Sequence, residues 1–110
     1  MTSEHIPLPD LSLHVLLALA EGDRHGWGVI KRIEELTDRR ESPSSGSLYL
    51  AMSRLEKAGL IENAPPPEEA DARRKYYRLT DRGRSVLARE VDRLSELVEW
   101  ARSAGVTGTG

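Results

Sequence analysis

The chain has 110 residues, of which 38% are hydrophobic and 31% charged, and this composition is typical of one domain with a single modest core. It contains no cysteine, which excludes disulfides, thiolate zinc sites and thiol catalysis. The longest apolar run, Val15 to Ala20, is too short to span a bilayer, and the N-terminus lacks the basic and apolar regions of a signal peptide. We therefore expect a cytoplasmic protein.

Charge is distributed unevenly along the chain, although the formal net charge is only −2. Residues 1–23 carry four acidic and no basic residues, whereas residues 24–84 carry thirteen basic and ten acidic residues. The middle of the chain is therefore its basic part, and DNA affinity depends on such local charge more than on the global balance.

The first third of the chain predicts an arm and two helices. Residues 1–9 are expected to form a flexible N-terminal arm, because Pro7 and Pro9 disfavour a helix. Asp10 is the expected N-cap of a first helix that runs to about residue 20. After a break at residues 21–23, the spacing of apolar residues predicts a second helix over about 26–37.

A third helix is predicted between Ser44 or Ser45, as its N-cap, and Gly59, as a left-handed C-terminal stop followed by Leu60. At 100° per residue its two faces differ in character. One face is apolar and is expected in the core: Leu48, Ala51, Met52 and Leu55. The opposite face is polar apart from one leucine: Gly46, Leu50, Ser53, Arg54 and Lys57.

Two strands and a long last helix complete the prediction. The strands are 60–62 and 73–79, joined by a loop at 63–72 that contains three prolines, and Tyr77 and Leu79 are expected on the buried side. The fold class is mainly α with a small β-hairpin: a winged helix-turn-helix at 10–80, a C-terminal dimerisation helix at 81–104 and a flexible tail at 105–110.

The last helix carries apolar residues at spacings of four, three, four and three, with Leu97 and Trp100 on the flank. A domain whose core is already built from three helices does not need this stripe, so we expect it to pack against a second copy of the chain. The predicted dimerisation residues are Leu87, Val91, Leu94, Leu97, Val98 and Ala101.

The third helix and the basic second strand are the candidate DNA-binding elements. Serine hydroxyls and amides at a helix N-terminus suit phosphate, an arginine suits a guanine edge or a phosphate, and four cations within residues 73–78 suit the DNA backbone. The candidate residues are Ser45, Ser47, Tyr49, Ser53, Arg54, Lys57, Arg73, Arg74 and Lys75. Of the last strand's cations, Lys75 or Arg78 could instead pair with acidic residues of the same subunit.

Taken together, these segments resemble the PadR-like family of bacterial winged-helix transcription regulators over roughly residues 11–103. The resemblance implies a homodimer in which the terminal helix of each subunit crosses to the other. It also implies a regulator that usually represses its targets and in some cases releases DNA when a small aromatic molecule binds. The matching stretches are His25-Gly26-Trp27, Ile30–Leu36, Ser44–Ile61, Arg73–Thr80 and Arg82-Gly83.

Three features depart from the family pattern. The chain stops after one long helix, similar to the compact branch that lacks a separate C-terminal domain. Leu50 stands where the family often has proline. The loop between the strands is acidic at its tip, so the tip should be repelled by phosphate; the acidic residues are Glu68, Glu69 and Asp71.

Other functions find less support in the sequence. His5, His14 and His25 lack the spacing of metal ligands, no cofactor motif or nucleophile–base pair is present, and no enzymatic activity is expected. His25-Gly26-Trp27 is interpreted as a helix entry in which His25 satisfies a backbone group and Trp27 packs. Trp100 is a tentative site for a flat aromatic ligand, or else a residue of the dimer core. The alternative overall function is a winged-helix protein-interaction module that does not bind DNA.

Overall fold

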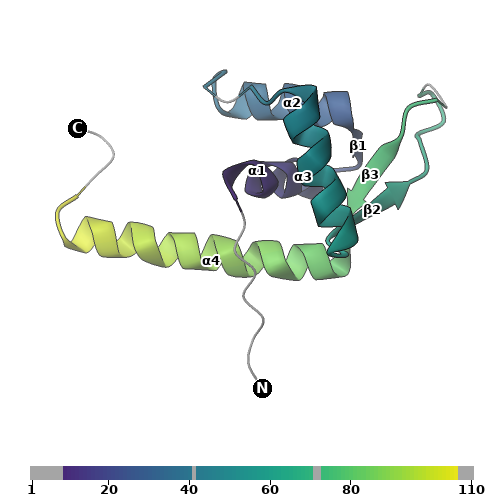
Figure 1. The fold of residues 1–110 in the computed structure, drawn as a ribbon. Helices are drawn as coiled ribbons and strands as arrows, with labels where there is room; N and C mark the ends of the chain where they lie inside the picture. Colours follow the sequence, from purple (N-terminus) through teal and green to yellow (C-terminus); the bar gives the residue numbers. More distant parts are fainter. Residues whose placement is uncertain (1–8, 41, 71–72, 107–110) are drawn as a thin grey trace.

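In the computed structural model, residues 9–40, 42–70 and 73–106 are described, and across them the chain forms four helices and three short strands (Figure 1). The elements are α1 (Asp10–Ala20), β1 (Arg24–His25), α2 (Gly26–Leu36), α3 (Ser45–Lys57), β2 (Ile61–Ala64), β3 (Tyr76–Leu79) and α4 (Asp81–Ser103). This order confirms the winged helix-turn-helix followed by a long helix. Most of the predicted arm and most of the predicted tail lie outside the described residues.

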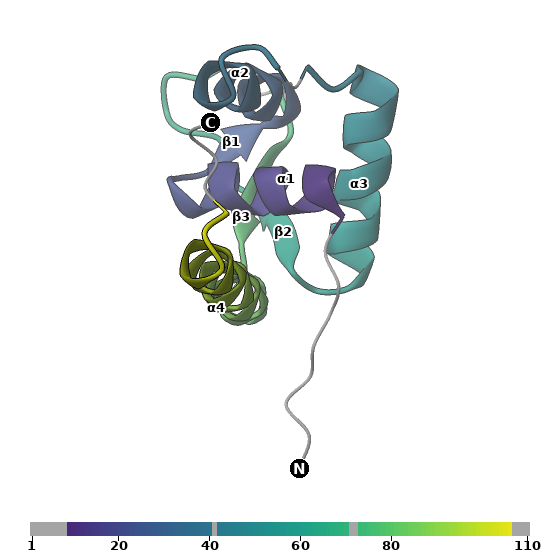
Figure 2. The ribbon, with the colours of Figure 1, turned by 90° about the vertical axis from the view of Figure 1, so that its left-hand side faces the viewer.

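Helix α1 lies at the centre of the domain and packs against α2, α3, α4 and β3 (Figure 2). Its buried Val15 and Leu16 meet the apolar face of α3, represented by Leu48 and Met52, in one continuous core. Burying aliphatic side chains of this size contributes roughly 1.5–3 kcal/mol each, so this shared core is what holds the three helices together.

The helix ends follow local sequence signals. Ser44 caps α3 by accepting a hydrogen bond from the Ser47 N–H at 3.1 Å, and Thr80 caps α4 in the same way from the Gly83 N–H at 2.9 Å. The prediction that Asp10 caps α1 was wrong. The cap position is Pro9, whose carbonyl accepts from the Leu13 N–H at 3.0 Å, so Asp10 already belongs to the first turn.

Helix α3 is terminated by Gly59, the glycine that the sequence predicted as its C-terminal stop. Gly59 has a φ of 77°, and the N–H groups of Gly59 and Leu60 donate to the carbonyls of Glu56 and Leu55 at 3.0 and 2.9 Å. These two bonds satisfy carbonyls that the helix leaves open, and they reverse the chain directly into β2.

The three strands form one antiparallel sheet in the order β1-β3-β2. Strand β1 was not predicted, because two residues carry no alternating pattern; it pairs Arg24 with Tyr77. Both strands of the hairpin differ from their predicted bounds: β2 runs from Ile61 to Ala64, where the prolines begin, and β3 starts only at Tyr76. The predicted facing is confirmed, since Tyr77 is buried and Leu79 packs against the core.

Helix α4 starts on the domain and then extends beyond it (Figure 1). The six predicted dimerisation residues of α4 therefore differ in burial. Leu87 is buried in this chain's own core, unlike the other five. Those five are at least partly exposed: Val91, Leu94, Leu97, Val98 and Ala101.

Gly83 is required where α4 crosses the end of α3, because a Cβ there would overlap the carbonyl oxygen of Leu60. We predict that Gly83→Ala lowers the free energy of unfolding by about 3 kcal/mol, since a backbone atom has to move. Urea denaturation measures the effect. Gly46→Ala is the matched control: its added Cβ meets open space inside a helix and should stabilise by up to about 1 kcal/mol. Equal stabilities for the two variants would contradict the prediction.

Candidate nucleic-acid interface

The polar face of α3 is exposed and its apolar face is buried, as the sequence predicted. Ser47 takes part in the helix cap, because its N–H and its hydroxyl both contact the Ser44 hydroxyl. The predicted contact residues on α3 are all exposed: Ser45, Ser47, Tyr49, Ser53, Arg54 and Lys57. Their side chains are therefore accessible along the whole length of the helix.

The strands and their connecting loop (residues 61–79, called the wing below) bring a second set of predicted residues beside α3. Arg73, Arg74 and Lys75 line a hollow of about 270 Å³ together with Tyr49 of α3 and Trp27 of α2. The hollow thus brings three cations together with the aromatic rings of Trp27, Tyr49 and Tyr77 from three separate parts of the chain, and His25 also lines it. This arrangement suits the sugar-phosphate backbone of a nucleic acid.

Tyr49 reaches the hollow because Gly26 has no side chain. A Cβ on Gly26, the buried first residue of α2, would lie 2.5 Å from the Tyr49 hydroxyl oxygen. The phenol therefore lies against the start of α2 while half of its surface stays exposed. Its hydroxyl is thereby positioned between α3 and the wing.

Some basic residues of the described chain form ion pairs with carboxylates and others, on α3 and elsewhere, do not. Arg24, Arg32, Arg78 and Arg93 pair with acidic residues of this chain, and the Arg78–Glu62 distance of 2.8 Å resolves the alternative left open for Arg78. On α3, by contrast, Arg54 and Lys57 have no ion-pair partner among the residues that the structure describes. The Lys75 ammonium lies 5.4 Å from the centroid of the Tyr77 ring. The α3 cations can therefore meet an anion without first breaking a contact.

His25 joins α2 to the wing. Its Nδ1 accepts a hydrogen bond from the Gly28 N–H at 3.0 Å, which confirms that it satisfies a local backbone group. Its ring meets Tyr76 edge-to-face, and the Arg74 guanidinium lies 3.3 Å from Nδ1. Partial burial, and then the positive charge of Arg74, hold the pKa of His25 below its usual value.

Trp27 does not pack as expected. It is 53% exposed, and the Lys31 ammonium lies 5.6 Å from its ring centroid. Sequence reasoning also missed its place on the hollow, although an aromatic residue beside a helix-opening glycine could have signalled it. No group of three or more potential metal-binding side chains occurs within the described part of the chain.

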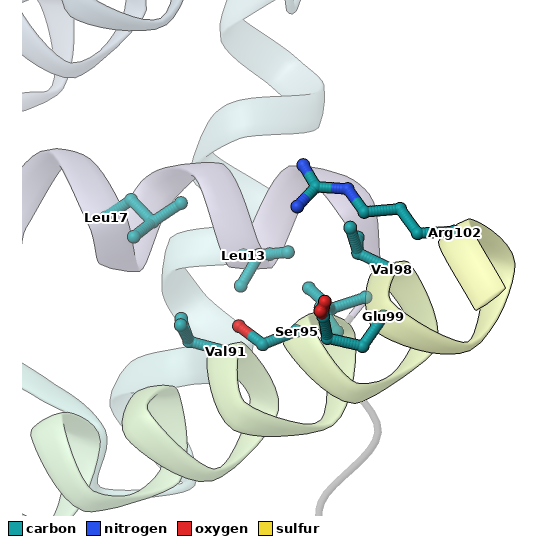
Figure 3. Close-up of a pocket in the computed structure, with 8 residues that line it drawn as sticks. Leu13, Leu17, Val91, Ser95, Val98, Glu99 and Arg102 are labelled. Atoms are coloured by element: carbon teal, nitrogen blue, oxygen red, sulfur yellow. The ribbon is translucent and has the colours of Figure 1, made fainter. Parts of the chain in front are cut away.

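A second hollow, of about 370 Å³, lies between α1 and the distal part of α4, and is called the α1–α4 groove below. Figure 3 shows Leu13 and Leu17 of α1 facing Val91 and Val98 of α4. Trp100 is 72% exposed and is not among the residues that line this groove. None of the helices in the described ranges is long and apolar enough to cross a bilayer.

Acidification is predicted to destabilise the protein through His25. The folded-state pKa lies below the value of about 6.5 expected in the unfolded chain, so the folded state binds fewer protons. The contribution of His25 is complete above about pH 6.5 and is lost as the pH falls through the folded-state pKa, because protonated Nδ1 cannot cap α2. Urea unfolding at about pH 7.5 and about pH 5 measures it. The control, His25→Asn, can cap without titrating and should lose less stability; equal losses would contradict the assignment.

The chain is similar to known proteins over most of its length. Residues 15–89 match the sequence profile of the transcriptional regulator PadR-like family. An uncharacterised 37.1 kDa protein in transposon TN4556 of Streptomyces fradiae is 38% identical over 88 residues, which cover 80% of this chain and 24% of that protein. The chain thus spans about a quarter of the length of this relative.

Solved structures of other proteins are also similar to this chain. A PadR family transcription regulator from Clostridium difficile R20291 has a TM-score of 0.74 and 26% identity, covering 86% of this chain and 97% of its own. Bacillus subtilis PadR, solved in complex with operator DNA, shares the fold with a TM-score of 0.65 and 22% identity, covering 76% of this chain and 47% of its own. The profile match, which spans more than half of the chain, together with the shared fold, makes this chain a member of the PadR-like family of transcriptional regulators, with the winged-helix fold.

Proposed function

We propose that the chain acts as a homodimeric repressor that binds an inverted-repeat operator in double-stranded DNA through α3 and the wing. The observation that carries the proposal is that Arg54 and Lys57 are exposed on α3 without ion-pair partners among the described residues, while Tyr49 of the same helix shares a hollow with Arg73, Arg74 and Lys75. An amphipathic helix of this kind fits the major groove, and a basic ribbon beside it fits the adjacent phosphates.

The dimer is supported by the distal half of α4. Its apolar residues have few neighbours in a single chain, and the α1–α4 groove offers a surface on which a second α4 can pack. A twofold axis across α4 would relate two α3 helices, and successive major grooves on one face of DNA lie roughly 34 Å apart. This geometry calls for two half-sites in inverted orientation.

Repression and operator binding are proposed on the family relationship. The fold shared with Bacillus subtilis PadR, whose structure contains operator DNA, supports the same docking mode here. Release by a small aromatic ligand is a further part of the proposal. Trp100 is exposed on the helix proposed to form the dimer, and its indole could stack on a flat ring. Such a ligand would act only if it bound two dimer arrangements with different affinity.

A protein-interaction module remains the second candidate function. The observation that favours it is the exposed acidic pair Glu68 and Glu69 on the wing, directly after the prolines, which phosphate would repel. In that case the cations of α3 would not be needed for the main binding event.

The DNA-binding proposal predicts that removing two positive charges strongly weakens binding to DNA. Arg54→Ala/Arg73→Ala should weaken binding to DNA from the region upstream of the protein's own gene and reduce the salt slope by about two per protomer, since each lost phosphate contact removes about 0.9. Fluorescence anisotropy across a salt series measures both quantities, with a shuffled duplex for comparison. Arg84→Ala/Arg89→Ala removes the same charge from α4 and is the matched control. Equal effects of the two double variants would favour the interaction module.

The dimer proposal predicts that Val98→Glu yields monomers. A carboxylate placed on this apolar stripe of α4 would have to leave water on dimerisation. Arg102, one turn later on the same groove, would offset only part of that cost, so self-association should weaken by about a hundredfold or more. Sedimentation equilibrium measures the dissociation constant. Val106→Glu places the same charge on an exposed valine beyond the end of α4 and should leave the dimer intact. A Val98→Glu protein that still dimerises like the wild type would reject this interface.

A further inference from the structure

Leu50 is an apolar residue on the otherwise polar outer face of α3. It is 53% exposed, and Gly46, Ser53 and Arg54 lie on the same face at helical spacings of four, three and four. A Cβ added at Gly46 would meet no atom within 4 Å, so no described residue covers this face at its N-terminal end. The leucine is therefore presented together with the groups proposed to meet DNA.

Leu50 also lies at the edge of a hollow in its own domain. Leu50 and Arg54 line one side of a hollow of about 360 Å³, whose other side is the start of α1 with Pro9 and Leu11. Part of the leucine side chain thus faces this hollow while the remainder is exposed.

A leucine has no hydrogen-bonding group and therefore cannot read the amino or carbonyl groups of a base edge. In the major groove the apolar group available to it is the 5-methyl group of thymine. Two cations lie near Leu50 on α3. Arg54 follows one turn later on the same face, and Lys57 follows Arg54 by three residues. Leu50 thus lies where α3 approaches the base edges.

We propose that Leu50 is a specificity-determining residue that contacts the 5-methyl group of a thymine at one symmetry-related position in each operator half-site. The proposal rests on the proposed DNA-binding function and assigns one side chain of α3 to base readout. It does not depend on whether Arg54 contacts a base or a phosphate.

Single replacement of thymine by deoxyuridine tests the contact, because it removes the methyl group and keeps the base pair. The probe is the tightest-binding duplex from a selection on genomic fragments, with each thymine replaced in turn. Wild-type protein should lose about fourfold in affinity per methyl at one position of each half-site. Leu50→Ala should bind the parent duplex more weakly and show no further loss at that position. Leu50→Met, which keeps an aliphatic side chain of similar volume, should retain the sensitivity.

Leu36→Ala is the matched control, because Leu36 is 57% exposed on α2 and lies outside the proposed interface. It should keep wild-type affinity and the full thymine pattern. If the wild-type and Leu50→Ala proteins show the same sensitivity at every thymine, the assignment of Leu50 is overturned while DNA binding stands. If no genomic fragment is bound above a shuffled duplex, the proposed function fails, and the assignment of Leu50 fails with it.

Discussion

The junction between the end of α3 and the start of α4 is the constraint on which the rest of the arrangement depends. The Thr80 N–H donates to the Leu60 carbonyl at 3.1 Å, and the Thr80 hydroxyl donates to the Gly59 carbonyl at 2.7 Å. Arg82 adds a bond from its Nε to the Ala58 carbonyl at 3.2 Å, and Gly83 lets the two backbones approach. Thr80 and Arg82 thus satisfy the carbonyls of the turn that follows α3, while the carbonyls of Arg54, Leu55 and Glu56 at the end of α3 accept from the N–H groups of residues 58–60.

This junction has a mechanical consequence for regulation. The turn that follows α3 is joined to the start of α4 by one backbone hydrogen bond and two side-chain hydrogen bonds, and both helices contribute residues to the shared core. A change in the angle between two α4 helices would therefore be passed to the α3 helices without bending the domain. In a dimer of this kind, a ligand need only alter how the long helices cross in order to change the spacing of the α3 helices. The site that senses the ligand and the site that meets DNA can then be separate.

The sequence predicted the features that depend on neighbours along the chain, and it failed where distant segments meet. Ser44 and Gly59 marked the ends of α3 because capping is a property of a few consecutive residues. Strand β1 could not be recognised, since its two residues become a strand only by pairing with β3. Leu87 fits the heptad spacing equally well, yet α4 begins against the core and turns that position inward. Periodicity identifies an apolar face but not the element that will cover it.

Charge explains how a chain with net charge −2 can present a surface for DNA. Several arginines are neutralised within the fold, as in the bidentate contact of Arg32 with Glu21 and of Arg93 with Glu90. These pairs fix local geometry. The Arg32–Glu21 pair is partly exposed and adds little stability, whereas Glu90 is buried and its pairing with Arg93 compensates for its lost hydration. The α3 cations are left without carboxylate partners among the described residues, so no ion pair has to be broken when an anion approaches them. The global charge counts every ionised group, whereas the polyanion meets only the side chains that the fold has left unpaired on one face.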